Sequence, residues 1–541
     1  MPHPPPPPVG PLDRGLSVLR ALCLPEAADR VRHSDLARTT GLARSTVDRV
    51  VTTLARLELV RGDGREVALA PRLLELGGAY LTASGVPAAL GPAVARLADE
   101  FGEPISVAVP DRDLVRFVVR ASSRRTTNLS FRVGDALPAD RCAPGAVFRD
   151  GPESALASSD EQSDEQSDQS PGRSAYEPVS GYTSAYQPGY ESAYEEQLVE
   201  PGLVTVALPL RDAAGRTVCA VSVASHTSRH TADSLARAVL PRLRQVRGAM
   251  EESLAAPRPE RRPVAAWAND SSAAAKRELG PAYLQSLARG LDVLRALGAD
   301  PGGGMPLTAV AEAAGLARAT ARRSLLTLEQ LGYAGRGPEG QRFALRPRVL
   351  ELGCARLSGL GLTDIAQPHL ADLVRQVGES VSLAVLDGPD IRYVARVPTV
   401  RIMSIDITVG TRFPAYATAM GRVLLAGLPA GERPALPAEL PALTGRTVTS
   451  AGLLTAVLDE VAAQGHALVD QELEEGLRSL AVPVRDGQGR VVAALNVAQH
   501  AGRGSAEGMR AAMLGALRQT AGRVETELRA VGVVTGTVGP A

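Results

Sequence analysis

The chain has 541 residues, of which 45% are hydrophobic, and its 59 basic and 59 acidic residues give a formal net charge of zero. This length is enough for about four domains of ordinary size, and a neutral chain must hold any surface for an anionic partner locally. The sequence has neither a run of about 18 apolar residues nor the apolar stretch of a signal peptide, so we expect a cytoplasmic protein that does not contact a membrane.

The sequence repeats itself over most of its length. Residues 12–22 recur 275 residues later as 287–297. The other matching segments are 41–44 with 315–318, 74–77 with 350–353, and 207–212 with 481–486. Solenoid repeats have periods of about 20–50 residues, so this interval predicts a whole multidomain protein duplicated inside one chain. Such a chain would do alone what a dimer of single copies does.

Five prolines at 4–8 predict a disordered arm, and a helical block then opens each copy. In the first block Gly41 supplies a turn, and Ala37 leaves room for two helices to cross closely; Gly315 and Ala311 repeat this spacing. The pattern predicts a helix-turn-helix in both copies.

Helix boundaries and faces follow from the same segments. Ser34 and Thr308 are the expected caps of the first helix. The second helix carries its apolar residues on one stripe at helical spacing. The stripe residues are Val47, Val50, Val51, Leu54 and Leu57 in the first copy and Leu325, Leu328 and Leu331 in the second.

A hairpin with a glycine-rich tip follows each block, at 59–69 and 332–345, and predicts a wing. Residues 30–72 contain nine arginines against five acids, and residues 306–348 contain seven against three. This local positive charge can neutralise DNA phosphates. An ordinary helical domain with solvated arginines is the alternative, but spacing, wing and charge coincide in both copies.

The rest of each copy mixes strands and helices. In the second copy a helix around 366–374 precedes strands at 381–386, 391–397 and 490–497. Such alternation with short turns suits a sensor domain built on a single sheet.

Residues 392–398 and 410–426, which include Gly-Thr-Arg-Phe-Pro-Ala-Tyr-Ala-Thr-Ala-Met-Gly-Arg, resemble the IclR family of bacterial transcription regulators. The resemblance covers nearly all of 12–250 and 283–531, and the second copy is similar to the subgroup that controls aromatic-acid degradation through protocatechuate and β-ketoadipate. It implies an α+β protein, with two copies of a winged helix-turn-helix plus a GAF-like α/β effector domain. It also implies dimerised DNA-binding domains and a small carboxylate ligand, an aromatic acid or a β-ketoadipate-like acid.

The domain boundaries expected on this basis follow the two copies. They are a disordered arm at 1–10, winged helix-turn-helix domains at 11–75 and 283–350, effector domains at 76–250 and 351–532, a linker at 251–282 and a disordered tail at 533–541.

The ligand class also has a physical argument, because Thr418 to Gly421 lie where a loop turns into a helix expected at 422–427, and a helix start favours an anion. The resemblance implies that the pocket is lined by Ala419, Met420, Leu477, Ser479, Asn496 and Ala498. One position departs from the family, because Val469 stands where a carboxylate is often found, although Asp470 is adjacent. An ordinary helix start beside a core strand is the alternative reading.

The first copy differs at this site, where Cys142 and Pro144 replace Thr418 and Met420, and proline has no N–H to offer. Residues 151–200 hold eleven acids and one arginine, so we expect this segment to be disordered and the pocket to be degenerate. The alternative is a divergent pocket with an insertion. The segment could also compete with DNA for arginines, or be an inert linker.

We expect the first turns of both recognition helices to contact DNA, with an arginine from each wing. The candidate residues are Arg44, Ser45, Thr46, Arg49 and Arg65 in the first copy and Arg318, Thr320, Arg322, Arg323 and Arg342 in the second. Ser45 aligns with Ala319 and Asp48 with Arg322, so the two helices should contact different bases. The expected operator is therefore double-stranded DNA with an imperfect palindrome. Two chains could also form a homodimer.

The sequence leaves two alternative functions, an enzyme and a sensor. His226 and His230 have the spacing of a metal pair, but no third ligand accompanies them, and no catalytic motif is present, so we expect no enzyme, cofactor or metal site. The four scattered cysteines fit buried thiols in a reducing compartment. The second alternative is a small-molecule sensor that has lost specific DNA binding.

Overall fold

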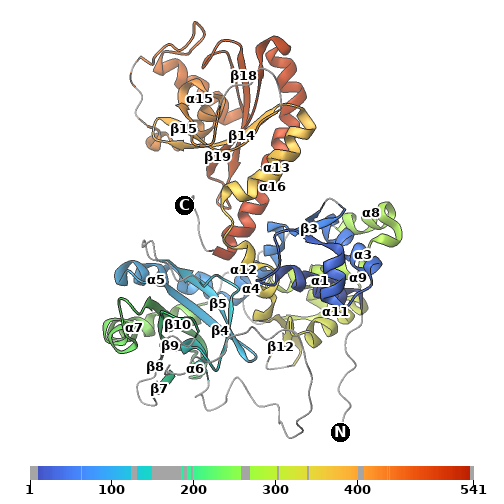
Figure 1. Cartoon of the computed structure of the whole chain (residues 1–541), viewed down its shortest axis with the longest axis vertical. Coiled ribbons are helices and arrows are strands. Elements are labelled where there is room, and N and C mark those ends of the chain that lie inside the picture. Colours follow the sequence, from blue (N-terminus) through green and yellow to red (C-terminus); the bar gives the residue numbers. More distant parts are fainter. Residues whose placement is uncertain are drawn as a thin grey trace. The chain divides into compact units, whose positions relative to one another are not determined.

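The computed structural model describes residues 10–62, 64–122, 131–148, 184–187, 192–196, 199–257, 269–300, 304–337, 340–399, 407–434, 437 and 439–535. The chain divides into two compact units, residues 1–359 with 533–536 and residues 360–532 with 537–541, which are described separately below (Figure 1). In the described part of the chain, no helix is long and apolar enough to cross a membrane. The predicted arm falls almost wholly outside the described residues, as does most of the predicted tail.

The first unit opens with a winged helix-turn-helix domain. Its helices are α1 (Pro11–Cys23), α2 (His33–Thr40) and α3 (Arg44–Arg56). Gly41 joins α2 to α3 in the left-handed conformation, with φ of 68°, which a side chain would disfavour. The strands β1 (Val31–Arg32), β3 (Glu66–Leu69) and β2 (Val60–Gly62) form the wing sheet in that order. The predicted apolar stripe of α3 is buried.

A second winged helix-turn-helix domain repeats this plan within the same unit. It contains α9 (Gln285–Leu297), α10 (Leu307–Ala313), α11 (Arg318–Gln330), and the strands β11 (Met305–Pro306), β13 (Arg342–Leu345) and β12 (Ala334–Arg336). The predicted caps are wrong in both copies. Arg32 and Pro306 hold the cap positions without side-chain hydrogen bonds, because α2 and α10 start directly after the short strands β1 and β11.

The first effector domain is a curled antiparallel sheet with helices on it. The sheet order is β6-β5-β4-β10-β9-β8-β7. The strands are β4 (Ile105–Asp111), β5 (Leu114–Ala121), β6 (Ala136–Pro138), β7 (Ser184–Gln187), β8 (Ser192–Glu196), β9 (Leu203–Arg211) and β10 (Thr217–His226). The helices are α4 (Leu74–Ser84), α5 (Val86–Phe101), α6 (Ala143–Ala146) and α7 (Ala232–Ala255).

Two predictions about irregular segments need correction. Residues 184–187 and 192–196, inside the stretch predicted to be disordered, form strands, and β8 pairs with β9. Backbone hydrogen bonds to β9 and the burial of Ser192, Ala193 and Glu195 order this end of the segment despite its acidic composition. The predicted linker at 251–282 also contains the end of α7 and the helices α8 (Asn269–Leu279) and η2 (Gly280–Ala282).

The second unit is the second effector domain. Its sheet order is β16-β15-β14-β19-β18-β17. The strands are β14 (Ser380–Asp387), β15 (Asp390–Val397), β16 (Arg412–Pro414), β17 (Ala467–Asp470), β18 (Leu477–Arg485) and β19 (Val491–His500). The helices include α13 (Leu362–Val377), α14 (Ala419–Ala426), α15 (Ala451–Gln464) and α16 (Ala506–Thr535), and α13 runs alongside α16 in Figure 1. The last three residues of α16 lie in the segment predicted to be a disordered tail.

Apart from the additional edge strand β7 of the first sheet, the two sheets share their strand order and their register. In the second, Ala481 lies opposite Asn496, which lies opposite Ser382. In the first, Ala207 lies opposite Ser222, which lies opposite Ser106. Positions on the two sheets can therefore be matched strand by strand. The short helices η3 (Pro347–Glu351) and α12 (Cys354–Leu357), which follow the second wing, complete the first unit.

Candidate functional site

The two helix-turn-helix domains pack against each other through α1 and α9. Leu287 of α9 covers Gly15 of α1, where an added Cβ would lie 2.3 Å from a leucine methyl carbon. Leu12 of α1 covers Gly290 of α9, where the same distance is 2.4 Å. Exchanging the copies turns one leucine–glycine pair into the other, which is the pattern of a two-fold interface. The helices α1 and α9 thus pack with the approximate two-fold symmetry that is typical of a contact between identical subunits.

Polar contacts across this interface are less symmetric. Arg295 of α9 forms an ion pair with Glu75 of α4 at 3.2 Å. Arg356 of α12 donates to three carbonyl oxygens at and beyond the end of α1, the shortest bond being 2.7 Å to Ala27, and it pairs with Asp29 at 3.0 Å. These contacts tie the second copy to the first by side chains that come mainly from the second.

The recognition helix of the second copy, α11, is strongly basic. Arg318, Arg322 and Arg323 are exposed on its first two turns, and among the described residues none of them forms an ion pair. Exposed cations at this position can contact DNA phosphates and the acceptor edges of bases without first breaking an internal contact.

The recognition helix of the first copy, α3, is partly neutralised. Asp48 lies 3.5 Å from Arg44 and 2.7 Å from the Nδ1 atom of His33. Arg49 donates a hydrogen bond of 2.9 Å to the carbonyl oxygen of Pro281. Two of the three predicted DNA-binding arginines of this copy, Arg44 and Arg49, therefore already have partners on the protein.

The remaining predicted DNA-binding residues lie on the first turns of the two recognition helices or in the two wings. Ser45 is exposed, and Thr46 and Thr320 are half-buried on the first turns of α3 and α11. Arg65 is exposed beside β3. Arg342 is exposed on β13 and donates to a backbone carbonyl oxygen before β11 at 2.8 Å.

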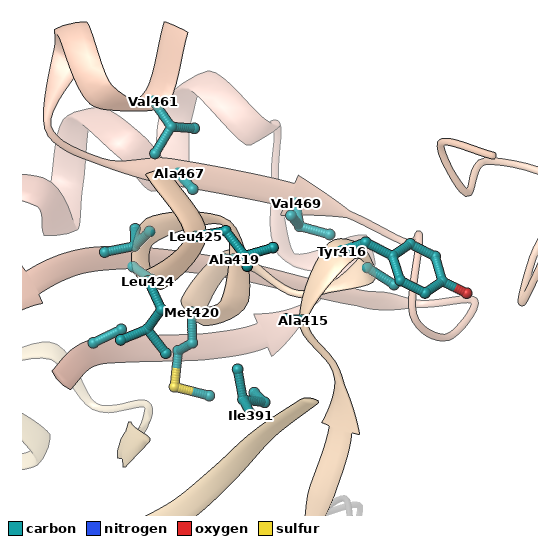
Figure 2. Packing of buried hydrophobic residues seen from close by; sticks show 14 of the residues in the cluster. Ile391, Ala415, Tyr416, Ala419, Met420, Leu424, Leu425, Val461, Ala467 and Val469 are labelled. Atoms are coloured by element: carbon teal, nitrogen blue, oxygen red, sulfur yellow. The ribbon is translucent and has the colours of Figure 1, made fainter. Parts of the chain in front are cut away.

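The predicted effector site of the second copy is centred on the start of α14. This helix begins at Ala419, three residues earlier than predicted, and the hydroxyl oxygen of Thr418 caps it by accepting a 3.0 Å hydrogen bond from the amide of Gly421. Thr418 and Gly421 are buried, and Ala419 and Met420 belong to one buried apolar cluster (Figure 2). In the described part of the chain, the amide of Ala419 has no acceptor. That N–H and the helix dipole suit an anion.

A buried ion pair holds α14 in place. Arg422 is 3% exposed, donates to the carbonyl oxygen of Tyr416 at 2.9 Å, and forms a bidentate pair with Glu472 at 2.8 and 2.6 Å. Glu472 also accepts from the amide of Val448 at 3.1 Å. Bidentate geometry of this kind fixes orientation as well as charge. This pair is not predictable from a local sequence pattern, because its members are fifty residues apart.

The other predicted effector residues share the sheet face toward α14. Ser479 lies opposite Ala498, and the next pair on that face, Ala481 with Asn496, is buried. With the side-chain oxygen and nitrogen of Asn496 exchanged, its amide nitrogen can donate to the carbonyl oxygens of Leu480 and Val497 at 3.1 and 3.2 Å. Leu477, Ser479 and Ala498 are half-buried. The structure thus brings the predicted residues together on one face.

Arg396 is a further residue on this face, and the sequence alone did not place it there. It lies opposite Ser382, which lies opposite Asn496, so all three side chains share one face of the sheet. Simple alternation along β15 places Arg396 with the exposed Arg392 on the outer face. A bulge in the pairing of β14 and β15 inserts one extra residue and reverses that parity.

Comparison with known proteins gives the identity of this architecture. The IclR helix-turn-helix domain model matches residues 11–64 and 286–338, and the model of the C-terminal domain of bacterial IclR regulators matches 354–526. The Pca regulon regulatory protein of Pseudomonas putida is 45% identical over 226 residues, which are 41% of this chain and 77% of that protein. The chain belongs to the IclR family. It is a DNA-binding transcriptional regulator and not an enzyme.

Other IclR relatives cover a similar share of the chain. The p-hydroxybenzoate hydroxylase transcriptional activator of Acinetobacter baylyi is 35% identical over 246 residues, 44% of this chain and 90% of that protein. A crystal structure of a regulator from Rhodococcus sp. RHA1 is 50% identical and covers 46% of this chain and 99% of that one, with a TM-score of 0.42. Each comparison spans less than half of this IclR chain, which carries the helix-turn-helix segment twice.

The histidine pair weighed as a metal site has other contacts in this IclR fold. His226 lies 2.7 Å from the hydroxyl of Ser228, and His230 lies 3.2 Å from that of Ser234. The described residues contain no group of three or more histidine, cysteine or acidic side chains that could hold a metal ion. All four cysteines are free thiols.

Proposed function

We propose that this IclR regulator reads an imperfectly palindromic operator as a dimer within one chain, under the control of a small carboxylate bound by the second effector domain. The carrying observation is the reciprocal packing of Leu12 on Gly290 and Leu287 on Gly15. It joins two reading domains of one chain in the relation that an operator with two half-sites requires.

The two half-sites should not be bound equally. In the first turns, α11 presents Arg318, Arg322 and Arg323 without an acid, whereas α3 has Arg44 and Arg49 with Asp48 between them. We therefore assign the tighter half-site to the second copy, with Arg322 in position to read guanine through two hydrogen bonds.

The ligand assignment rests on the second effector domain. The amide of Ala419 and the charge of Arg396 suit a carboxylate, while Met420 and Leu477 offer apolar surface for a ring. Ser479 on the same face suits a ring hydroxyl. A relative named for activating p-hydroxybenzoate hydroxylase supports an aromatic acid, and aromatic-acid catabolism as the regulated process.

DNA binding is tested with the full chain on DNA from upstream of its own gene. We expect a shift that weakens steeply with salt, one chain bound per operator, and a change of affinity with p-hydroxybenzoate, protocatechuate or β-ketoadipate. Arg322→Ala should cost about 1–3 kcal/mol at one half-site only. Arg237→Ala, on an exposed arginine of α7, is the matched control.

Three results would contradict the proposal. Equal loss at both half-sites would remove the assignment of Arg322. Two chains per operator would show that the intrachain interface is not the reading dimer. Absence of salt-dependent binding would favour a sensor that has lost specific DNA recognition.

A further inference from the structure

An acid is buried inside the first effector domain. Glu195 of β8 is 1% exposed, and its carboxyl group accepts a 3.2 Å hydrogen bond from the amide of Ala143 at the start of α6. The surrounding cluster is apolar and includes Cys142, Ala143 and Ala193. Burial raises the pKa of Glu195 to about 8, although Thr205 and the Ala143 amide act in the opposite direction. Acids are rarely buried without a specific reason, because desolvation is costly.

The place of Glu195 can be matched in the second copy through the sheet register. Glu195 lies opposite Thr205, as Val469 lies opposite Ser479. The next pair along is Ala193 with Ala207 in the first copy. Ala467 with Ala481 forms the same pair in the second. Glu195 therefore occupies on the first sheet the position that Val469 occupies on the second.

The helix starts that face these positions match as well. Gly145 packs so closely on Ala139 that an added Cβ would lie 2.2 Å from its carbonyl oxygen, and Gly421 packs on Ala415 with 2.1 Å. Ala143 lies two residues before Gly145, and Ala419 lies two residues before Gly421, so the two alanines occupy matching positions. The amide that has no acceptor among the described residues of the second copy is thus the amide that Glu195 bonds in the first.

We propose that Glu195 is a built-in occupant of the first effector site. Its carboxyl group takes the place beside the Ala143 amide that a ligand carboxyl takes beside the Ala419 amide, because the side chain of Val469 offers that amide no acceptor. Figure 2 shows Val469 and Ala419 in the same cluster. This inference rests on the proposed effector site of the second copy.

A chain of this kind has two effector domains but binds a free ligand in only the second of them. An intramolecular carboxyl group meets its site at a fixed, high effective concentration, so a free ligand would have to displace a tethered competitor. Val469 has no polar atom that could compete in the same way. In this chain the first copy therefore carries its own carboxyl group at the amide that the second copy leaves to a ligand.

The first experiment counts bound ligand on the full chain by equilibrium dialysis with p-hydroxybenzoate. We expect one molecule for the wild type and two for Glu195→Val. Glu195→Gln, which keeps the shape and an acceptor for the Ala143 amide, should stay at one. Two molecules on the wild type, or one on a folded Glu195→Val, would overturn the inference. None on the wild type would overturn the proposed function for this ligand.

The second experiment does not depend on the effector's identity. Glu195→Ala removes the carboxyl group, and acetate should then raise the unfolding midpoint of this variant while acetamide does not. Glu200→Ala, at an exposed acid that follows β8, is the matched control. Acetate should leave that variant and the wild type unchanged. No acetate-specific effect on Glu195→Ala would overturn the inference even if the second copy binds ligand.

Discussion

The reciprocal contact between α1 and α9 gives a quantitative prediction for Gly290→Ala. An added Cβ would lie 2.4 and 2.5 Å from the two methyl carbons of Leu12, well inside the roughly 3.5–4.0 Å of a favourable carbon contact. Leu12 is 5% exposed, so it has little room to move without separating the helices. Overpacking of a buried contact costs about 1–3 kcal/mol.

Helix propensity acts in the opposite direction and must be measured separately. Replacing a helical glycine by alanine gains about 1 kcal/mol in a helix interior. Gly248→Ala in α7 provides this reference, because Gly248 is exposed and nothing lies within 4 Å of an added Cβ. We expect Gly248→Ala to raise the free energy of unfolding. Gly290→Ala should be less stable than Gly248→Ala by the cost of overpacking, about 1–3 kcal/mol.

The measurement is urea unfolding of both variants together with operator affinity. Gly290→Ala should also weaken binding to the two-half-site operator, and adding Leu12→Ala should restore part of that affinity by making room for the new methyl group. Gly248→Ala should not change operator affinity. Equal stabilisation by the two glycine substitutions, with unchanged operator binding, would refute the packing of α1 against α9.

Three further predictions concern charged groups. Glu195 has a pKa of about 8 in the folded chain, above its ordinary 4.5, so its contribution to stability is complete below pH 4.5 and is lost as the pH rises through 8. Urea unfolding from pH 4.5 to 8 should show that fall in the wild type but not in Glu195→Gln, and parallel curves would contradict it. Glu472→Gln removes the counter-charge of Arg422, whose side chain is 4% exposed, and should lower the free energy of unfolding by about 3–5 kcal/mol. Adding Arg422→Met should recover most of that loss. An unchanged midpoint of thermal unfolding in Glu472→Gln would contradict the prediction. Arg396→Met should weaken p-hydroxybenzoate binding by about 1.5–3 kcal/mol with operator affinity unchanged, as measured by calorimetry and mobility shift, and full ligand affinity would exclude Arg396 from the site.

The sequence was most informative where local patterns decide the structure. The stripe on α3 and the turn at Gly41 depend on neighbours a few residues away, and duplication doubled the signal. The strand residues predicted to bind the effector lie on one face of the sheet, and their role in binding stays a prediction. The helix caps failed because short wing strands, not side chains, set where α2 and α10 begin.

Long-range features could not be read in the same way. The acidic composition of 151–200 predicts disorder, yet β8 is ordered by pairing with β9, which composition does not show. Arg396 was missed because one extra residue in a strand reverses which face later side chains occupy. Burial of Glu195 beside Ala143 joins residues 52 apart, and no local pattern indicates it.

Arg356 shows what fusing two copies permits. In a homodimer every substitution enters an interface twice, so a residue that helps on one side must also be tolerated on the other. Here Arg356 reaches the end of α1, while the matching position of the first copy is Tyr80, which is buried. Each face of the fused interface can change by a single mutation without its mirror image. The chain has thereby gained the freedom of a heterodimer while both halves are always made in equal amounts.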